Sequence, residues 1–460
     1  MHRTLRFLAL PAAAVAAGAM LHGHRPAVQA DDVYRVASVQ LPPRAREAYQ
    51  PGEVIVQFRD AVRERDAAEM MWEAGGRKVR RSAFGFRYLV DLDGGFAVAD
   101  VLERLREMPG VAYAEPNGIV RAFQQRVGFF TPRDPFYTSQ WHFKMLDSER
   151  TWGIQKGDSS VAVAVLDSGI AYEDFGPYRK APDFGGTVFL QGHDFVNGDE
   201  HANDDNFHGT HVASTIAEAT DNSIGVAGLA FGCALMPVKV LDNEGVGSFF
   251  GVADGIDYAV TFTLNGQKPV KVINLSLGGD STSTAVRQAV DRAVAAGVTV
   301  VAAAGNDGEG KISFPAALPN VIAVGAVDGR KVKAPYSNFG PELSVVAPGG
   351  DIRRDDTGPD GVPDGRPDGV LQQTFDPDTA ERTGRYDDFH YFFVVGTSQA
   401  TPHVAALAAL LYRQGITQPA AIKAAIQNTA EDLGASGRDD TFGYGLIRPV
   451  LALRGYGLNQ

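Results

Sequence analysis

From about Ser160 onward, short apolar runs alternate along the chain with stretches of helical character. The apolar runs cover residues 161–166, 235–241, 272–277, 298–304 and 321–327, and residues 284–296 form an intervening helical stretch. Strands that are apolar on both faces predict an α/β fold, with a mainly parallel sheet and helices on both faces. Functional side chains in such folds gather at the carboxyl ends of the strands. Asp167, Ser276 and Asn306 each lie at or just past a predicted strand end.

Residues 31–125 show a different pattern, in which shorter strand and helix signals alternate. Strand signals at residues 54–58, 88–90 and 111–113 are separated by helical signals at residues 65–74 and 98–108. In the second helix, four apolar residues recur on one face, and Pro109-Gly110 ends it. The pattern predicts a small α+β domain, then a linker at residues 126–135 and a larger domain at residues 136–460.

The first 30 residues have the pattern of a secretory signal peptide. Arg3 and Arg6 precede an apolar stretch at residues 7–20, and Val28-Gln29-Ala30 is a small-x-small cleavage site with the cut after Ala30. A membrane anchor fits less well, because the stretch is shorter than the ~20 residues that span a bilayer. We therefore expect a secreted protein, either extracellular or periplasmic.

Charge and cysteine content restrict the partners and the sources of stability. The formal net charge is −12, which argues against nucleic acid or an anionic membrane surface as a partner. Cys233 is the single cysteine, so no intramolecular disulfide can form. Its apolar neighbours predict a buried, inert thiol rather than a nucleophile. We expect a monomer.

Two polar residues lie in short motifs that suggest nucleophilic catalysis. Asp167 ends an apolar strand in Leu166-Asp167-Ser168-Gly169, where an isolated Asp more often caps a turn. His208 begins His-Gly-Thr-His-Val-Ala-Ser-Thr, in which Gly209 would allow close approach of another chain or a substrate. The second histidine, His211, is expected to be structural. A zinc site is a poor alternative, because the i, i+4 spacing and the Glu of a His-Glu-x-x-His helix are absent.

A third motif supplies a hydroxyl. Ser398 lies in Gly-Thr-Ser-Gln-Ala-Thr-Pro-His ahead of the apolar residues 404–412. We expect Pro402 in the first turn of a helix, where its missing N–H has no helical partner. Ser398 would then stand at the helix N-terminus with its own N–H free. By itself, this segment could equally contain a plain N-cap serine.

The order of these three motifs is informative. Asp, His and Ser follow one another as in subtilisin, unlike the orders in chymotrypsin and the α/β-hydrolases. Asp-Ser-Gly-Ile, His-Gly-Thr-His-Val-Ala and Gly-Thr-Ser-x-Ala-Thr-Pro-His-Val-Ala closely resemble the three signatures of the subtilase family. The resemblance implies a subtilisin-like fold and a serine endopeptidase with Asp167, His208 and Ser398 as its catalytic triad.

The resemblance also implies positions around the triad. Asn306, after the apolar residues 300–304, corresponds to the side-chain donor of the oxyanion hole. The expected substrate-binding residues lie on three segments: the strand that pairs with extended substrate, the opposite wall of the S1 pocket, and residues that either line S4 or simply pack in the core. They are Ser276, Leu277 and Gly278, then Ala303 and Gly305, then Phe249 and Val252. No acidic residue occurs in the expected S1 segments, so we expect large apolar or uncharged P1 residues.

The N-terminal domain resembles the family's inhibitory propeptide, for which a ferredoxin-like fold is expected. Residues 109–117 match its end, so residues 31–125 would act as an intramolecular inhibitor, cleaved off by the enzyme itself between Ala122 and Phe136.

Calcium is the expected structural cofactor, and no catalytic cofactor is expected. The family's site would comprise Asp183, Asn222 and the carbonyls of Thr220, Ile224 and Val226, because oxygen ligands suit a hard cation. An acidic insertion at about residues 350–393 contains Asp360, Asp364 and Asp368. These form either a second calcium site or a solvated acidic loop.

Two other functions remain as alternatives. A non-catalytic peptide-binding protein on the same fold would not need a complete triad. An acid peptidase with a Ser-Glu-Asp site would not need His208 in its full motif or Asn306. Polypeptides are the expected substrates of a peptidase and the expected ligands of a binding protein.

Overall fold

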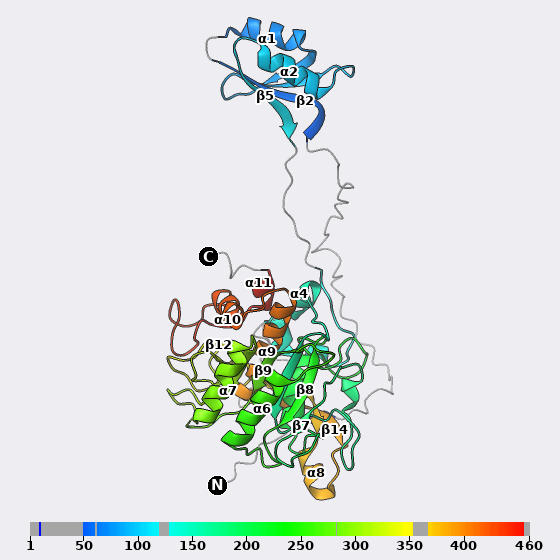
Figure 1. Cartoon of the computed structure of the whole chain (residues 1–460), viewed down its shortest axis with the longest axis vertical. Coiled ribbons are helices and arrows are strands. Elements are labelled where there is room, and N and C mark those ends of the chain that lie inside the picture. The colour runs from blue at the N-terminus through cyan, green and yellow to red at the C-terminus, as the bar shows by residue number, and fades with distance from the viewer. Residues whose placement is uncertain are drawn as a thin grey trace, which may run out of the picture. The chain divides into compact units, whose positions relative to one another are not determined.

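The computed structural model describes residues 9–10, 49–59, 62–118, 128–281, 283–352 and 367–454. The chain divides into two compact units, residues 19–126 and residues 127–460 together with residues 1–18. We call them the N-terminal unit and the C-terminal unit, and each is described by itself (Figure 1).

A seven-stranded, wholly parallel sheet forms the centre of the C-terminal unit, in the order β12-β11-β10-β9-β6-β8-β7. Its strands are β6 (Ala162–Asp167), β7 (His193–Asp194), β8 (Ala234–Lys239), β9 (Val270–Leu275), β10 (Thr299–Ala303), β11 (Ile322–Val327) and β12 (Val345–Pro348). Every residue of β6, β8, β10 and β11 is buried, as the apolar runs predicted, and the charged exception in these runs, Lys239 of β8, is buried as well. The prediction missed only the two shortest strands, β7 and β12.

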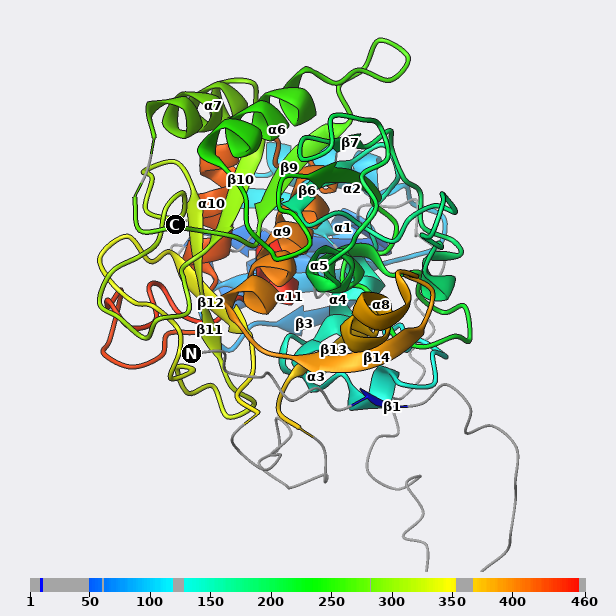
Figure 2. The ribbon, with the colours of Figure 1, turned by 90° about the horizontal axis from the view of Figure 1, so that it is seen from below.

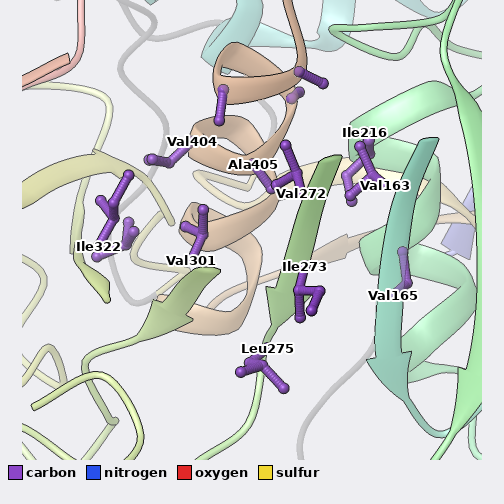
Figure 3. Close-up of a cluster of buried hydrophobic side chains, with 14 of the residues drawn as sticks. Val163, Val165, Ile216, Val272, Ile273, Leu275, Val301, Ile322, Val404 and Ala405 are labelled. Carbon is purple, nitrogen blue, oxygen red and sulfur yellow. The ribbon is translucent and has the colours of Figure 1, made fainter. Parts of the chain in front are cut away.

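Helices cover both faces of this sheet. Figure 2 shows α6 (Phe249–Thr261) and α7 (Thr284–Ala295) on one side of the strands, with α5 (His208–Ala217) and α9 (Thr397–Arg413) on the other. Nearly all of α9 is buried, which explains why its sequence is apolar all round and rich in alanine. In Figure 3, Val404 and Ala405 of α9 lie among Val272, Val301 and Ile322 of the sheet.

Four shorter helices complete the surface of this unit. They are α3 (Trp141–Met145), α4 (Ser148–Ile154), α10 (Pro419–Asn428) and α11 (Pro449–Leu453). No helix of the described ranges is long and apolar enough to cross a bilayer. Cys233 is buried, and burial raises the pKa of its thiol to about 12, in keeping with an inert cysteine.

The second half of the expected acidic insertion contains an antiparallel strand pair joined through a helix. These elements are β13 (Val370–Phe375), α8 (Pro377–Thr383) and β14 (Phe389–Val394), and β13 is buried along its whole length. The strand pair packs on α5, where Ser214 Oγ donates to the carbonyl of Gln373 at 3.2 Å. A two-residue strand, β1 (Ala9–Leu10), pairs with β14. β1 falls within the segment expected to be a secretory signal.

The N-terminal unit has a ferredoxin-like βαββαβ fold, which confirms the prediction. Its elements are β2 (Tyr49–Phe58), α1 (Glu64–Glu73), β3 (Gly76–Arg81), β4 (Arg87–Leu92), α2 (Val98–Glu107) and β5 (Val111–Gly118), and the antiparallel sheet has the order β3-β4-β2-β5. Val54, Val90, Val101 and Leu105 lie in its core. The prediction missed β3, because all but the first of its residues are exposed and four are basic.

Candidate active site

The carboxylate of Asp167 and the imidazole of His208 are in direct contact. Asp167 is the last residue of β6 and fully buried, and His208 is the first residue of α5. Nδ1 of His208 lies 2.7 Å from Oδ1 of Asp167, and the backbone N–H of Ser168 donates to the same oxygen at 2.8 Å. The carboxylate therefore fixes the orientation of the ring, with Nε2 as the nitrogen left for a reacting group.

Two glycines make room for the segments around this contact. A Cβ on Gly209 would collide with the carbonyl oxygen of Gly169 and approach the side chain of Asp167. Gly169 has φ = 109°, and a Cβ there would collide with the carbonyl of Asn203. Gly209 therefore admits the segment that follows Asp167, rather than a substrate or a separate chain.

The two histidines of α5 have opposite electrostatic environments. Burial lowers the pKa of His208, but the charge and hydrogen bond of Asp167 outweigh it, and the pKa lies above its ordinary value. His211 is buried against the carbonyls of Val370 and Phe392, and burial lowers its pKa to about 3. His211 is therefore neutral and structural, whereas His208 can accept and hold a proton.

Ser398 is the second residue of α9, so its backbone N–H is not used in the helix. The reason differs from the one that we expected, because Pro402 lies in the second turn and not in the first. An N–H at position 402 would bond to the carbonyl of Ser398. Since Pro402 has none, that carbonyl accepts from Ser276 Oγ at 2.8 Å instead. In return, Ser398 Oγ donates to the carbonyl of Ser276 at 3.0 Å.

The side chain of Asn306 is held by the residue that precedes Ser398. Its Oδ1 accepts hydrogen bonds from both the N–H and the Oγ of Thr397, each at 2.9 Å. Gly396, with φ = 155°, makes room for this turn, because a Cβ there would lie 2.6 Å from Oε1 of Gln399. Because Oδ1 is engaged in this way, the Nδ2 amide is the part of the side chain left to donate to a ligand, and Asn306 lines a cavity together with Ser398.

Two adjoining cavities bring together the predicted substrate-binding residues. The larger, of about 830 Å³, is lined by His208, Ser276, Phe249 and Val252 among others. The smaller, of about 310 Å³, is lined by Ala303, Gly305, Asn306 and Ser398. Leu277 and Gly278 line both cavities. An extended peptide that follows this segment would pass from one cavity to the other.

Sequence reasoning missed two acidic residues at the smaller cavity. Asp280 and Asp307 both line it, although each lies one residue beyond a segment that we considered for S1. The side chain of Asp280 is 93% exposed, and its Oδ1 lies 3.7 Å from Nζ of Lys311. The acidic charge at this cavity is therefore solvated, and Lys311 partly balances it.

The predicted calcium ligand Asp183 lies in a buried acidic region. It is fully buried, its oxygens accept hydrogen bonds from the Asn222 amide and the Val226 N–H, and burial raises its pKa to about 7. Glu218 is also fully buried, and neither of its oxygens has a hydrogen-bond partner among the described residues. Asp134 raises the pKa of both carboxyls. Sequence reasoning missed Asp134 and Glu218, whose spacing carries no signal.

The remaining metal candidates are not brought together in the described part of the chain. Asp360 and Asp364 lie outside the described residues. Asp368 is buried, and its carboxylate accepts the N–H of Gly329, at 3.0 Å for the closer oxygen. Within the described ranges, no group of three or more His, Cys, Asp or Glu side chains is arranged to hold a metal ion.

Comparisons with known proteins agree with the geometry. The family described as the Subtilase family matches residues 158–445, and the Fervidolysin N-terminal prodomain matches residues 37–117. A thermophilic serine proteinase of Bacillus sp. strain AK1 is 36% identical over 88% of each chain. Thermitase of Thermoactinomyces vulgaris is 36% identical over 67% of this chain and 94% of its own. A solved protease structure from Pseudoalteromonas arctica has a TM-score of 0.60 and 30% identity, covering 71% of this chain and 99% of its own.

Proposed function

This chain belongs to the subtilase family and is a serine-type endopeptidase with an N-terminal prodomain, and we propose that Asp167, His208 and Ser398 form its catalytic triad. The contact of 2.7 Å between His208 and Asp167 carries this proposal. Ser276 connects the third residue of the triad, Ser398, with the other two. It lines the same cavity as His208 and accepts a hydrogen bond from Ser398.

The mechanism follows from these positions. Ser398 Oγ turns from the carbonyl of Ser276 to Nε2 of His208 and attacks the scissile carbonyl carbon while His208 takes its proton. Asp167 stabilises the imidazolium that forms. His208 then gives the proton to the leaving amine, and a water molecule hydrolyses the acyl-enzyme by the same proton transfers in the second half of the reaction.

Two donors would hold the oxyanion that forms in each half. They are the N–H of Ser398, free at the start of α9, and the Nδ2 amide of Asn306. The bonds from Thr397 to Asn306 Oδ1 support this role, because they orient the amide before the substrate arrives. We assign the smaller cavity to S1 and the larger cavity to the subsites that precede it.

Secretion and maturation complete the proposal. Residues 1–30 would be removed on export, and residues 31–125 would occupy the cleft as an inhibitor until Ser398 cleaves the linker at residues 126–135. Phe130 packs on Trp152 and Phe231 of the C-terminal unit. We therefore place the cut before Phe130, since a chain anchored there cannot lie extended across the active site. Polypeptides are the substrates, and a monomer without nucleic acid or membrane partners is the expected form.

Calcium would stabilise the mature enzyme at Asp183. No Lys or Arg of the described chain is among the groups that shift the pKa values of the buried carboxyls of Asp183 and Glu218, and burial raises both values, so a bound cation would favour the ionised forms. Asn222 and the carbonyls of Thr220, Ile224 and Val226 would add neutral oxygens, as calcium prefers. Asp134 braces this loop by accepting the N–H groups of residues 221–223.

A fluorophosphonate probe and a precursor assay test the function. The probe should label wild-type protein at Ser398 and not label Ser398→Ala, whereas Ser160→Ala, an exposed loop serine, should label normally. Purified Ser398→Ala should also keep its N-terminal unit, and that unit added separately should inhibit the mature enzyme. Absence of labelling in the wild type would favour the non-catalytic alternative. Normal maturation of purified Ser398→Ala would exclude self-processing.

A further inference from the structure

Phe207, the residue before His208, has an unusual backbone conformation. Its φ is 89° and its ψ is −27°. Residues other than glycine seldom adopt such a positive φ, and those that do are mostly small polar residues. Among the described residues, Phe207 is the aromatic member of a set of six that otherwise consists of Asp147, Asp221, Ser223, Asn265 and Lys331.

Hydrogen bonds on both sides hold Phe207 in this conformation. Asp204 is fully buried, and its Oδ1 accepts the N–H groups of Asn206 at 3.0 Å and Phe207 at 3.1 Å. Its Oδ2 accepts the N–H of Thr210 at 2.9 Å, which ties the turn to the first turn of α5. Thr374 Oγ1 of β13 donates to the carbonyl of Phe207 at 2.7 Å. The surroundings therefore impose the strained turn.

A glycine at this position would make the same backbone bonds without strain. The strained conformation is therefore explained by a requirement for the Phe207 side chain. Backbone strain of this kind is concentrated at functional sites. Phe207 is partly exposed, and it lines the larger cavity together with His208, Leu241 and Val246. Phe207 thus contributes to the wall of the cleft directly beside the general base.

We propose that Phe207 is a specificity-determining residue whose ring forms a wall of the S2 subsite and favours an apolar side chain at P2. This inference rests on the proposed triad and on the assignment of the smaller cavity to S1. Leu277 and Gly278 line both cavities, so a peptide whose P1 side chain enters the smaller one continues into the larger. Successive side chains of an extended peptide point in opposite directions. P2 therefore turns away from S1 and towards His208 and Phe207.

The test compares Phe207→Gly with wild type on a peptide library that varies P2 at fixed P1. Glycine accepts the backbone angles, so the variant should fold, and cooperative thermal unfolding checks this. Its preference for Leu, Val or Phe over Gly or Ser at P2, measured as a ratio of kcat/KM, should fall at least about tenfold. Phe207→Asn, which also tolerates a positive φ, should give the same loss.

Asn265→Gly is the matched control, because it relieves a positive φ of 51° in a segment that lines neither cavity. It should leave the P2 profile unchanged. An unchanged P2 profile in folded Phe207→Gly and Phe207→Asn would overturn the proposal, as would a change confined to P4 or to the primed side. Failure of wild type to label at Ser398 would instead remove the proposed function itself, so the two failures are distinguishable.

Discussion

Ser276 and Ser398 exchange hydrogen bonds, each through its Oγ to the carbonyl oxygen of the other, at 2.8 Å and 3.0 Å. Asn274 Nδ2 donates to Ser276 Oγ at 3.0 Å and holds it in place. The exchange depends on Pro402, because a residue with an N–H at that position would bond to the Ser398 carbonyl within the helix. Because Pro402 has no N–H, the Ser398 carbonyl at the start of α9 is available to Ser276, the residue that follows β9.

This dependence predicts a thermodynamic coupling. Ser276→Ala should lower stability by about 1–3 kcal/mol, because it leaves the carbonyl of Ser398 without a donor. In a Pro402→Ala background the helix supplies an N–H, so the same substitution should cost less. Melting temperatures of the four proteins of this cycle, each blocked with a fluorophosphonate, measure the difference. Equal costs in the two backgrounds would show that Pro402 plays no part.

Asn306→Ala should lower kcat by about 10²- to 10³-fold with little change in KM, a magnitude that is typical of subtilisin, a member of the same family. In the proposed mechanism, the amide donates to the oxyanion only in the transition state, so its loss should slow turnover without weakening substrate binding. Asn306→Asp, which keeps the size and the acceptor for Thr397, should be comparably slow. Steady-state kinetics on a peptide substrate measure both constants. A rise in KM at constant kcat would assign Asn306 to substrate binding instead.

Activity should fall in acid as His208 is protonated. The free base takes the proton from Ser398, and the pKa of His208 lies above its ordinary value, so the acid limb of kcat/KM should lie above about pH 6.5. Asp204 is a further charge that raises this pKa. A pH profile on a neutral peptide substrate measures the limb. Activity confined to strongly acidic solution would favour the Ser-Glu-Asp alternative.

Chelation of calcium should lower the melting temperature of the mature enzyme. Calcium at 100 times its Kd contributes about 2.7 kcal/mol to the folded state, and a chelator removes that contribution. Asp183→Asn should melt lower in calcium and respond less to the chelator, whereas Asp291→Asn, on the exposed side of α7, should behave as wild type. The same melting temperature in calcium and in chelator would argue against this site.

Large apolar or uncharged residues should dominate at P1. Asp280 is 93% exposed and has Lys311 beside it, so its charge is screened and should not select Arg or Lys. Asp280→Asn should therefore change the P1 profile less than about threefold in kcat/KM, consistent with the small energies of exposed charge pairs. A peptide library profiles P1 directly. Dominance of Arg or Lys there would show that Asp280 and Asp307 act as a specificity site.

Much of this protein is evident from local sequence. The mainly apolar runs determine β6, β8, β10 and β11, because strands buried on both faces tolerate few polar residues. The order of the motifs around Asp167, His208 and Ser398 is enough to indicate the family, since the chemistry needs those groups in fixed surroundings. The α+β character of the N-terminal unit was likewise predictable from its helix and strand periods, apart from β3, whose basic and exposed residues carry no apolar pattern. Its ferredoxin-like topology was expected only from the resemblance to the family's propeptide.

Contacts between distant segments were decided only by tertiary structure. The sequence around Pro402 does not show whether this residue lies in the first or the second turn of a helix. Only the position of α9 beside β9 shows that Ser276 donates to the Ser398 carbonyl. Asp134 and Glu218 meet Asp183 through loops whose spacing has no period. Phe207 carries no sequence mark of its positive φ, because Asp204 and Thr374 impose that angle from elsewhere in the fold. Local pattern determines elements, whereas strain and electrostatic environment depend on what the fold places beside each residue.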